Sequence, residues 1–178
     1  MSRPPGAPDA YAALTRGTAF LRASAAGRGA SAPPMVAGNA LAELDRLLHV
    51  LIAQAARDRG VGSSVRAGGN ADRLTALCGA HADGARLCAL RRSVTCLRRH
   101  GGRARHADRR GCGFMTVGWS NAGSIGLHRI DLGASIVPSA QQMTDVCAFY
   151  DRLARRVLDS RRDIARAIPP HGLVRLAA

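Results

Sequence analysis

The stretch "PPMVAGNALAELDRLLHVLIAQAARDRG", residues 33–60, decides the fold of this chain. Its apolar residues recur at steps of three and four positions: Leu41, Leu44, Leu48, Leu51 and Ala55. Because an α-helix completes a turn in 3.6 residues, these side chains share one face. The prolines suit the first helical turn and Gly60 suits the end. The stretch therefore predicts a long amphipathic helix that packs its apolar face into a core.

Four further segments show helical spacing of apolar residues on either side of this helix. They cover about residues 9–26, 70–81, 85–100 and 139–167. Asn70 is a plausible N-cap for the second of them. In the last one, the Ser-x-x-Gln pattern that begins at residue 139 is a capping box, and the aspartates and arginines are expected to pair along the solvent face, as in Asp151 with Arg155.

The helical spacing is interrupted between the fourth and fifth helices. The runs "FMTVGW" (114–119) and "IGLHRIDL" (125–132) favour strands, and "SNAGS" between them has the composition of a hairpin connection. The chain is therefore predicted to be mainly α, a five-helix bundle with a short β-hairpin inserted between the fourth and fifth helices. The length fits a single helical domain over 1–178, with flexible ends at 1–8 and 168–178 and a flexible loop at 60–69.

Arginine dominates the charge of the chain. All 26 basic residues are arginine, there are 12 acidic residues, and the net charge is +14. Nine of the arginines and a single aspartate fall within 86–110, so this short segment carries +8 of that charge. A positive field of this kind attracts phosphate backbones and other anionic surfaces.

Cysteine use and the N-terminal residues bear on the compartment. The five cysteines form no Cys-x-x-Cys pair and are odd in number, which favours reduced thiols over a disulfide framework. Residues 1–14 lack the continuous apolar stretch of a signal peptide, and no apolar run is long enough to span a bilayer. We therefore expect a cytoplasmic protein without a membrane partner.

Metal and nucleotide chemistry lack their usual residues. Two-metal nucleases need several convergent carboxylates, whereas this chain has a single glutamate, Glu43, and no Asp-x-Asp cluster. Cys78 and His81, with Cys88 and Cys96 on the next helix, match no standard zinc spacing. No glycine-rich stretch ends in the Lys-Ser/Thr of a phosphate loop. We therefore expect neither a metal nor a cofactor.

The segment "CLRRHGGRARHADRRGCG", residues 96–113, is the candidate functional stretch. On a helical wheel, arginines border the apolar stripe of the fourth helix and also lie on its far side. Gly101 and Gly102 should then release the backbone, so that the remaining arginines extend from a loop. The predicted nucleic-acid-binding residues are Arg91, Arg92, Arg98, Arg103, Arg105, Arg109 and Arg110.

The same segment holds the parts of a metal-independent ribonuclease. Arginine can grip phosphate with two hydrogen bonds, and a histidine beside it can exchange a proton near neutral pH. Arg99 would stabilise the charge of the transition state, while His100 or His106 would move a proton at the ribose 2′-hydroxyl or the leaving oxygen.

The run "RHGGRARH", residues 99–106, resembles the motif of the HEPN family (higher eukaryotes and prokaryotes nucleotide-binding domain). That motif places an arginine, a polar residue and then a histidine after a short gap on the last core helices of an α-helical domain. Many members are dimeric, metal-independent ribonucleases, and others only bind nucleotides or RNA. The resemblance implies an RNA partner in preference to DNA, a homodimer, and catalytic roles for Arg99, His100 and His106.

Three alternatives stay open from the sequence. The third and fourth helices could form a helix-turn-helix whose Arg86, Arg91 and Arg92 reach a DNA major groove. The chain could instead be a non-enzymatic protein-interaction module. His49 follows Asp45 by one helical turn, as an acid-base couple or as a hydrogen-bonded flank of the core. The lack of aromatic residues between Phe20 and Phe114 argues against base-stacking platforms of the RRM or OB kind.

Overall fold

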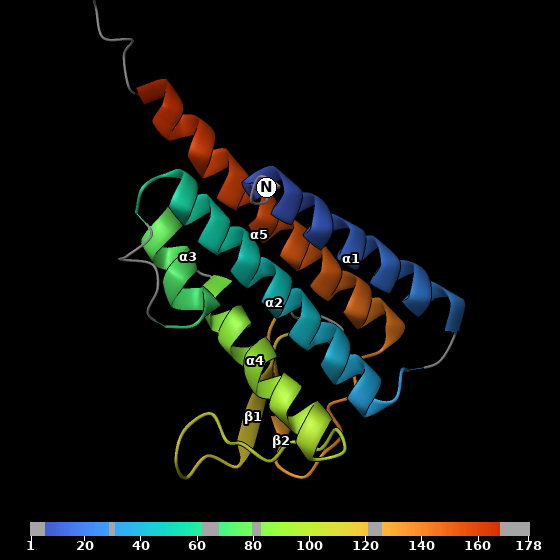
Figure 1. Cartoon of the computed structure of the whole chain (residues 1–178). Coiled ribbons are helices and arrows are strands. Elements are labelled where there is room, and N and C mark those ends of the chain that lie inside the picture. The colour runs from blue at the N-terminus through green and yellow to red at the C-terminus, as the bar shows by residue number, and fades with distance from the viewer. Residues whose placement is uncertain (1–5, 29–30, 62–67, 80–82, 121–125, 168–178) are drawn as a thin grey trace, which may run out of the picture.

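The described residues form five helices and one β-hairpin (Figure 1). The computed structural model describes residues 6–28, 31–61, 68–79, 83–120 and 126–167, with side chains as far as Ser160. In chain order the elements are α1 (Ala7–Arg28), α2 (Pro34–Asp58), α3 (Asn70–Cys78), α4 (Asp83–Arg99), β1 (Phe114–Val117), β2 (His128–Asp131) and α5 (Ala140–Ala167). The prediction of a mainly helical bundle with a hairpin between the fourth and fifth helices is confirmed.

Helix α2 is the centre of the bundle. It lies between α1 and α5 on one side and α3 and α4 on the other (Figure 1), and it contacts all four of them. Leu41, Leu44, Leu48 and Leu51 are fully buried along it. Pro34 occupies the first turn, and the left-handed Gly60 (φ 71°) follows the end. The predicted amphipathic helix is therefore confirmed, because the leucines form one continuous apolar face of α2 that packs into the core.

Helices α1 and α5 are joined by a buried polar contact. Asp151 on α5 is only 8% exposed and accepts a hydrogen bond of 2.6 Å from Thr18 Oγ1 and a charged one from Arg22 Nη2, both on α1. The expected pairing of Asp151 with Arg155 along the solvent face is wrong. The α5 face that holds Asp151 is covered by α1, so the carboxylate finds its partners across the helix interface.

Asn70 joins α3 to α2. Its side-chain nitrogen donates to the Asp45 backbone oxygen at 2.7 Å and to Asp45 Oδ1 at 2.8 Å. The α3 N-cap is therefore Gly69, one residue before the expected Asn70. Since Asn70 Oδ1 can only accept, His49 Nδ1, 3.3 Å away, is the donor, and His49 Nε2 accepts from Arg73 Nη1 at 3.0 Å. His49 is thus a hydrogen-bonded flank of the core, and Asn70 lies between it and Asp45.

The hairpin packs beneath α4 (Figure 1). Its antiparallel register pairs Phe114 with Asp131 and Thr116 with Arg129. Along β1, Met115 and Val117 are buried against the helices, whereas the intervening side chains are only half-buried. One face of the hairpin therefore closes the core and the other faces outward.

The predicted capping box of α5 is confirmed. Gln142 N–H donates to Ser139 Oγ at 3.2 Å, and Ser139 N–H donates to Gln142 Oε1 at 2.8 Å. At the other end of the chain, α1 begins at Ala7, inside the segment 1–8 that was expected to be flexible. Gly6 N–H donates to Asp9 Oδ2 at 2.9 Å and sets this start.

The remaining flexibility predictions concern residues 1–5, 62–67 and 168–178, which lie outside the described residues. Within the part of the chain that is described, no helix combines the length and the apolar character needed to cross a membrane.

Candidate nucleic-acid interface

Two glycines end α4 and turn the chain. His100 N–H and Gly102 N–H both donate to Cys96 O, at 3.0 and 3.1 Å. Gly101 (φ 59°) and Gly102 (φ 76°) are left-handed, a conformation that glycine adopts without strain. A Cβ on Gly102 would lie 2.8 Å from Val137 Cγ2. The turn therefore needs glycine at residue 102 for its φ angle and for its close packing.

The prediction that Gly101 and Gly102 release the backbone into a loop is wrong. The two glycines lead the chain into a short β-bridge between Arg103 and Ser135. Gly102 O accepts from Ile136 N–H at 2.7 Å. Ala104 N–H donates to Ala134 O at 2.9 Å, and Ala104 O accepts from Gly133 N–H at 2.8 Å. Since Ala104 is fully buried while Arg103 is exposed, the bridge fixes which side chains of this segment face solvent. A pinned backbone presents its arginines in a defined arrangement.

Asp108 attaches the rest of the loop to the fold. Its carboxylate lies 3.0 Å from Arg92 Nη2 on α4 and accepts the Thr116 N–H of β1 at 2.8 Å and the Thr116 hydroxyl. Burial alone would raise the pKa of Asp108, but the hydrogen bonds from Thr116 and the charges of Arg92 and Arg129 outweigh it and lower the pKa. Asp108 therefore stays ionised and holds the loop between α4 and the hairpin.

The two histidines of the segment lie against each other. The ring centroids of His100 and His106 are 5.2 Å apart, with the ring planes at 63°. His100 is half-buried at the end of α4, and His106 is exposed. Arg99 comes seven residues after Arg92 and so lies on the same stripe of α4, the stripe that faces the Asp108 loop. The structure thus brings the two predicted catalytic histidines together, with Arg99 at the end of the adjoining helix.

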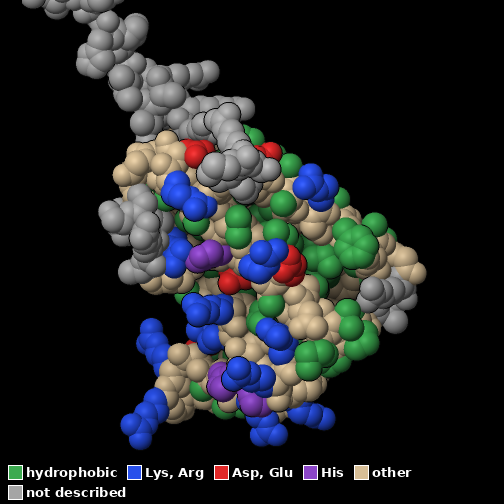
Figure 2. Space-filling view, viewed as in Figure 1, with side chains coloured by type: hydrophobic (Ala, Val, Ile, Leu, Met, Phe, Trp, Pro, Cys, Tyr) green, Lys and Arg blue, Asp and Glu red, His purple; other side chains and the backbone are tan. Residues whose placement is uncertain are grey.

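Five of the seven predicted arginines are exposed on the same segment of the chain as this histidine pair. Figure 2 shows arginine side chains, with histidines among them, gathered over the C-terminal end of α4 and the following loop. Arg103 donates through Nη1 to Gly133 O at 3.0 Å, and the residue is exposed. We call this surface the basic end; its exposed or half-buried members are Arg98, Arg99, His100, Arg103, Arg105, His106, Arg109 and Arg110.

Arg91 and Arg92 do not belong to the basic end. Arg92 is half-buried and is paired with Asp108. Arg91 is exposed but lies near the start of α3, where it lines a small recess with Asp45 and Cys88. It precedes Arg99 by roughly 12 Å along the axis of α4. Arg92 therefore forms an ion pair within the protein, and Arg91 lies at a separate place on the surface.

Arg86 is an interior residue. It is 9% exposed, donates through Nε to Gly118 O at 2.9 Å, and lies over the Phe149 ring with its guanidinium carbon 4.4 Å from the centroid. Burial, then the charge of Arg152, lowers its pKa. Arg86 thus ties α4 to the end of β1 and to α5.

Sequence reasoning missed Asp108, Phe114 and Arg129 as parts of this region. One signal was present for Asp108, because a single carboxylate within an arginine-rich run has cations on all sides and pairs readily with one of them. The Arg129 guanidinium stacks on Phe114, 4.7 Å from the ring centroid. That contact depends on strand register, which residue spacing alone does not define.

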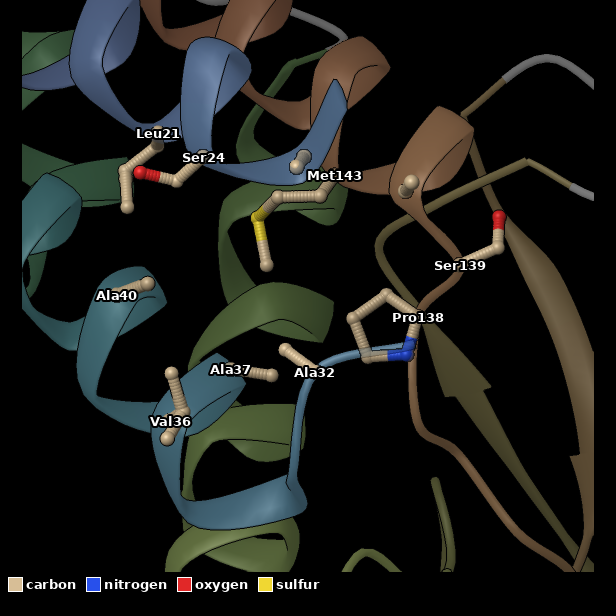
Figure 3. Close-up of a pocket in the computed structure, with 11 residues that line it drawn as sticks. Leu21, Ser24, Ala32, Val36, Ala37, Ala40, Pro138, Ser139 and Met143 are labelled. Atoms are coloured by element: carbon tan, nitrogen blue, oxygen red, sulfur yellow. The ribbon is translucent and has the colours of Figure 1, made fainter. Parts of the chain in front are cut away.

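An apolar recess lies beside the basic end. It is lined by α1, by the start of α2 and by the chain before and within α5, and its space is about 440 Å³ including the open mouth. Leu21, Val36 and Met143 come to it from three helices, and its polar side-chain atoms are the hydroxyls of Ser24 and Ser139 (Figure 3). Because none of its lining residues titrates, the recess offers a contact surface and no acid-base chemistry.

The described residues contain no group of three or more histidines, cysteines or carboxylates that could hold a metal ion. Comparison with family models, with curated proteins and with solved structures finds no match to this chain. The class of protein is therefore defined by the fold alone, a mainly helical bundle with an inserted hairpin and a basic end.

Proposed function

We propose that the chain binds RNA through the basic end and cleaves it without a metal ion. The observation that carries this proposal is the edge contact between His100 and His106, 5.2 Å apart by ring centroids, within a surface of exposed arginines. Arginine pairs with phosphate through two parallel hydrogen bonds, and two adjacent imidazoles can act as base and acid. RNA is favoured over DNA because the 2′-hydroxyl supplies the nucleophile.

The chemistry needs only the histidines, an arginine and the substrate. One imidazole accepts the proton of the ribose 2′-hydroxyl while its oxygen attacks the adjacent phosphorus. The bond from phosphorus to the 5′-oxygen breaks as the other imidazole, in its protonated form, donates a proton to that oxygen. Arg99 stabilises the charge that develops on the phosphoryl oxygens. The products are a 2′,3′-cyclic phosphate and a 5′-hydroxyl.

Because the pattern at residues 99–106 resembles the HEPN motif, we also propose that the chain is related to the HEPN family and forms a homodimer. The helical architecture is compatible with this relationship. The helix-turn-helix alternative fits less well, because Arg86 and Arg92, two of its three DNA-reading arginines, are engaged within the protein.

Cleavage of a labelled single-stranded RNA in excess EDTA tests the proposal. We expect cleavage to continue, to end in a 2′,3′-cyclic phosphate, and to fall by roughly 10² to 10⁴ in His106→Ala with little change in RNA binding. Arg99→Ala should weaken both RNA binding and RNA cleavage. Cleavage that EDTA abolishes, or full activity in the His100→Ala/His106→Ala variant, would overturn the catalytic part.

A second candidate function is protein interaction through the apolar recess. Val36, one of its lining residues, is 42% exposed. Met35 and Phe20, which precede the lining residues Val36 and Leu21 in the chain, are 51% and 70% exposed. Exposed apolar patches of this kind mark protein contacts. Val36→Asp should then abolish association with a protein partner and leave RNA affinity unchanged, whereas the reverse result would assign the recess to RNA.

A further inference from the structure

The outer face of the hairpin presents an aromatic ring with a cation stacked on it. Phe114 and Thr116 of β1 point to this face, since Met115 and Val117 between and beyond them are buried on the other. Arg129 of β2 is exposed, and its guanidinium carbon lies 4.7 Å from the Phe114 centroid. Phe114 thus packs against the Arg129 guanidinium, while Arg129 as a residue is exposed.

This face is continuous with the basic end. Asp108 N–H donates to Phe114 O at 3.2 Å, and the Asp108 carboxylate accepts from Thr116. His106 precedes Asp108 by two residues. A strand of RNA that contacts His106 therefore has the Phe114–Arg129 pair within reach of its neighbouring nucleotides.

The charges around the pair indicate which part of a nucleotide fits there. Asp131 lies directly opposite Phe114 on β2 and is exposed. Asp108 and Asp131 balance the two cations Arg92 and Arg129. A neutral face repels phosphate less than an acidic one but does not attract it as the basic end does. The Phe114–Arg129 pair instead offers a planar π surface of the kind on which nucleobases stack.

We propose that the Phe114–Arg129 pair stacks an unpaired base, and hence that the RNA bound by the basic end is single-stranded. This inference rests on the proposed RNA binding of the basic end. Bases within a duplex are already stacked on their neighbours, so only a single strand or a loop can supply the base. Phe114 contributes by restricting the orientation of the Arg129 guanidinium before the base binds, which lowers the entropy cost of ordering the Arg129 side chain.

Binding of a fluorescein-labelled single-stranded oligonucleotide and of the same sequence as duplex RNA, by anisotropy with the full chain, tests the inference. Arg129→Lys keeps the charge and loses the plane, and Phe114→Leu keeps an apolar side chain and loses the ring. Each should weaken single-strand binding by roughly 5- to 100-fold and leave duplex binding unchanged. The slope of affinity against salt should stay the same in Arg129→Lys, since no phosphate contact is lost.

Arg16→Lys is the matched control, because Arg16 is an exposed arginine of α1 that belongs neither to the basic end nor to the Phe114–Arg129 pair. It should leave single-strand binding unchanged. Equal binding of both RNAs by the wild type, with Arg129→Lys like the wild type, would overturn the stacking site and leave RNA binding standing. Failure of the wild type to bind either RNA would overturn the proposed function itself. If Phe114→Leu fails to fold, judged by thermal melting, the exposed Arg129→Lys still decides.

Discussion

The Arg92 guanidinium lies 3.0 Å from the Asp108 carboxylate, and this ion pair joins α4 to the loop that carries His106. The same carboxylate accepts hydrogen bonds from Thr116 on β1. Asp108 is the sole acidic residue between positions 86 and 110. One side chain therefore fixes the loop relative to both the helix and the hairpin.

We expect Asp108→Asn to destabilise the protein by about 1–2 kcal/mol at neutral pH, because it removes the charged partner of Arg92 and one of the acceptors of Thr116. Urea unfolding measures the change. The exposed Asp131→Asn on the neighbouring strand is the control and should unfold like the wild type. A variant Asp108→Asn as stable as the wild type would show that the loop does not depend on this pair.

The same difference should depend on pH in one direction. The pKa of Asp108 is lowered in the fold from an ordinary value of 3.8, so its carboxylate stabilises the protein above that value. As the pH falls through the folded-state pKa, the wild-type carboxyl is protonated and this contribution is lost. The stability gap between wild type and Asp108→Asn should therefore be full at neutral pH and close below the ordinary value. A gap that widens in acid would contradict the lowered pKa.

Salt should weaken RNA binding steeply. If the basic end contacts six or more phosphates, affinity should fall by roughly 10³- to 10⁵-fold between about 50 and 200 mM salt. Arg109→Ala/Arg110→Ala should reduce the slope of log affinity against log salt by roughly 2. Arg16→Ala/Arg46→Ala, two exposed arginines of α1 and α2, is the matched control and should keep the wild-type slope. Affinity that is independent of salt would exclude the phosphate backbone as the main contact.

The fold could be predicted because it follows from local patterns. The leucine spacing of α2, the turn residues and the capping box of α5 each act within a few residues of the chain. Asp151 could not be predicted, because its partners Thr18 and Arg22 lie on α1, more than 125 residues away. The N-cap role predicted for Asn70 was wrong for the same reason, because the Asn70 side chain donates to Asp45 on α2 and does not cap α3.

The candidate site could be predicted in its residues but not in its arrangement. A surplus of charge within 25 positions is visible in the sequence, and so is the His100 and His106 pair. The loop geometry depends on long-range contacts, above all the β-bridge between Arg103 and Ser135 and the pairing of Arg92 with Asp108. Helix α4 is packed on two sides, so a helical wheel with one apolar stripe misplaces Arg92 on a solvent face.

Arg86 provides a test of the interior role of one arginine. Arg86→Ala should lower the free energy of unfolding by about 2–4 kcal/mol, because it leaves a cavity beside Phe149 and removes the donor to Gly118 O. Arg86→Met should cost less, since it fills the space and removes a partly unsatisfied buried charge. Urea unfolding measures both. RNA affinity of folded Arg86→Met should equal that of the wild type, whereas a marked loss would show that Arg86 contacts nucleic acid.

The five cysteines should react in the order of their exposure. Cys88 is exposed, Cys78 and Cys112 are half-buried, and Cys96 and Cys147 are buried. Burial raises the pKa of Cys147 to about 11, and because the thiolate is the reactive form, this thiol is protected by access and by protonation. Iodoacetamide at about pH 8 should therefore modify Cys88 first and Cys147 last, as followed by peptide mass spectrometry. Full labelling of Cys147 should need urea, and Cys88→Ser should remove the fast phase without changing stability. Fast native labelling of Cys147 would mean that α5 separates from α1 in solution.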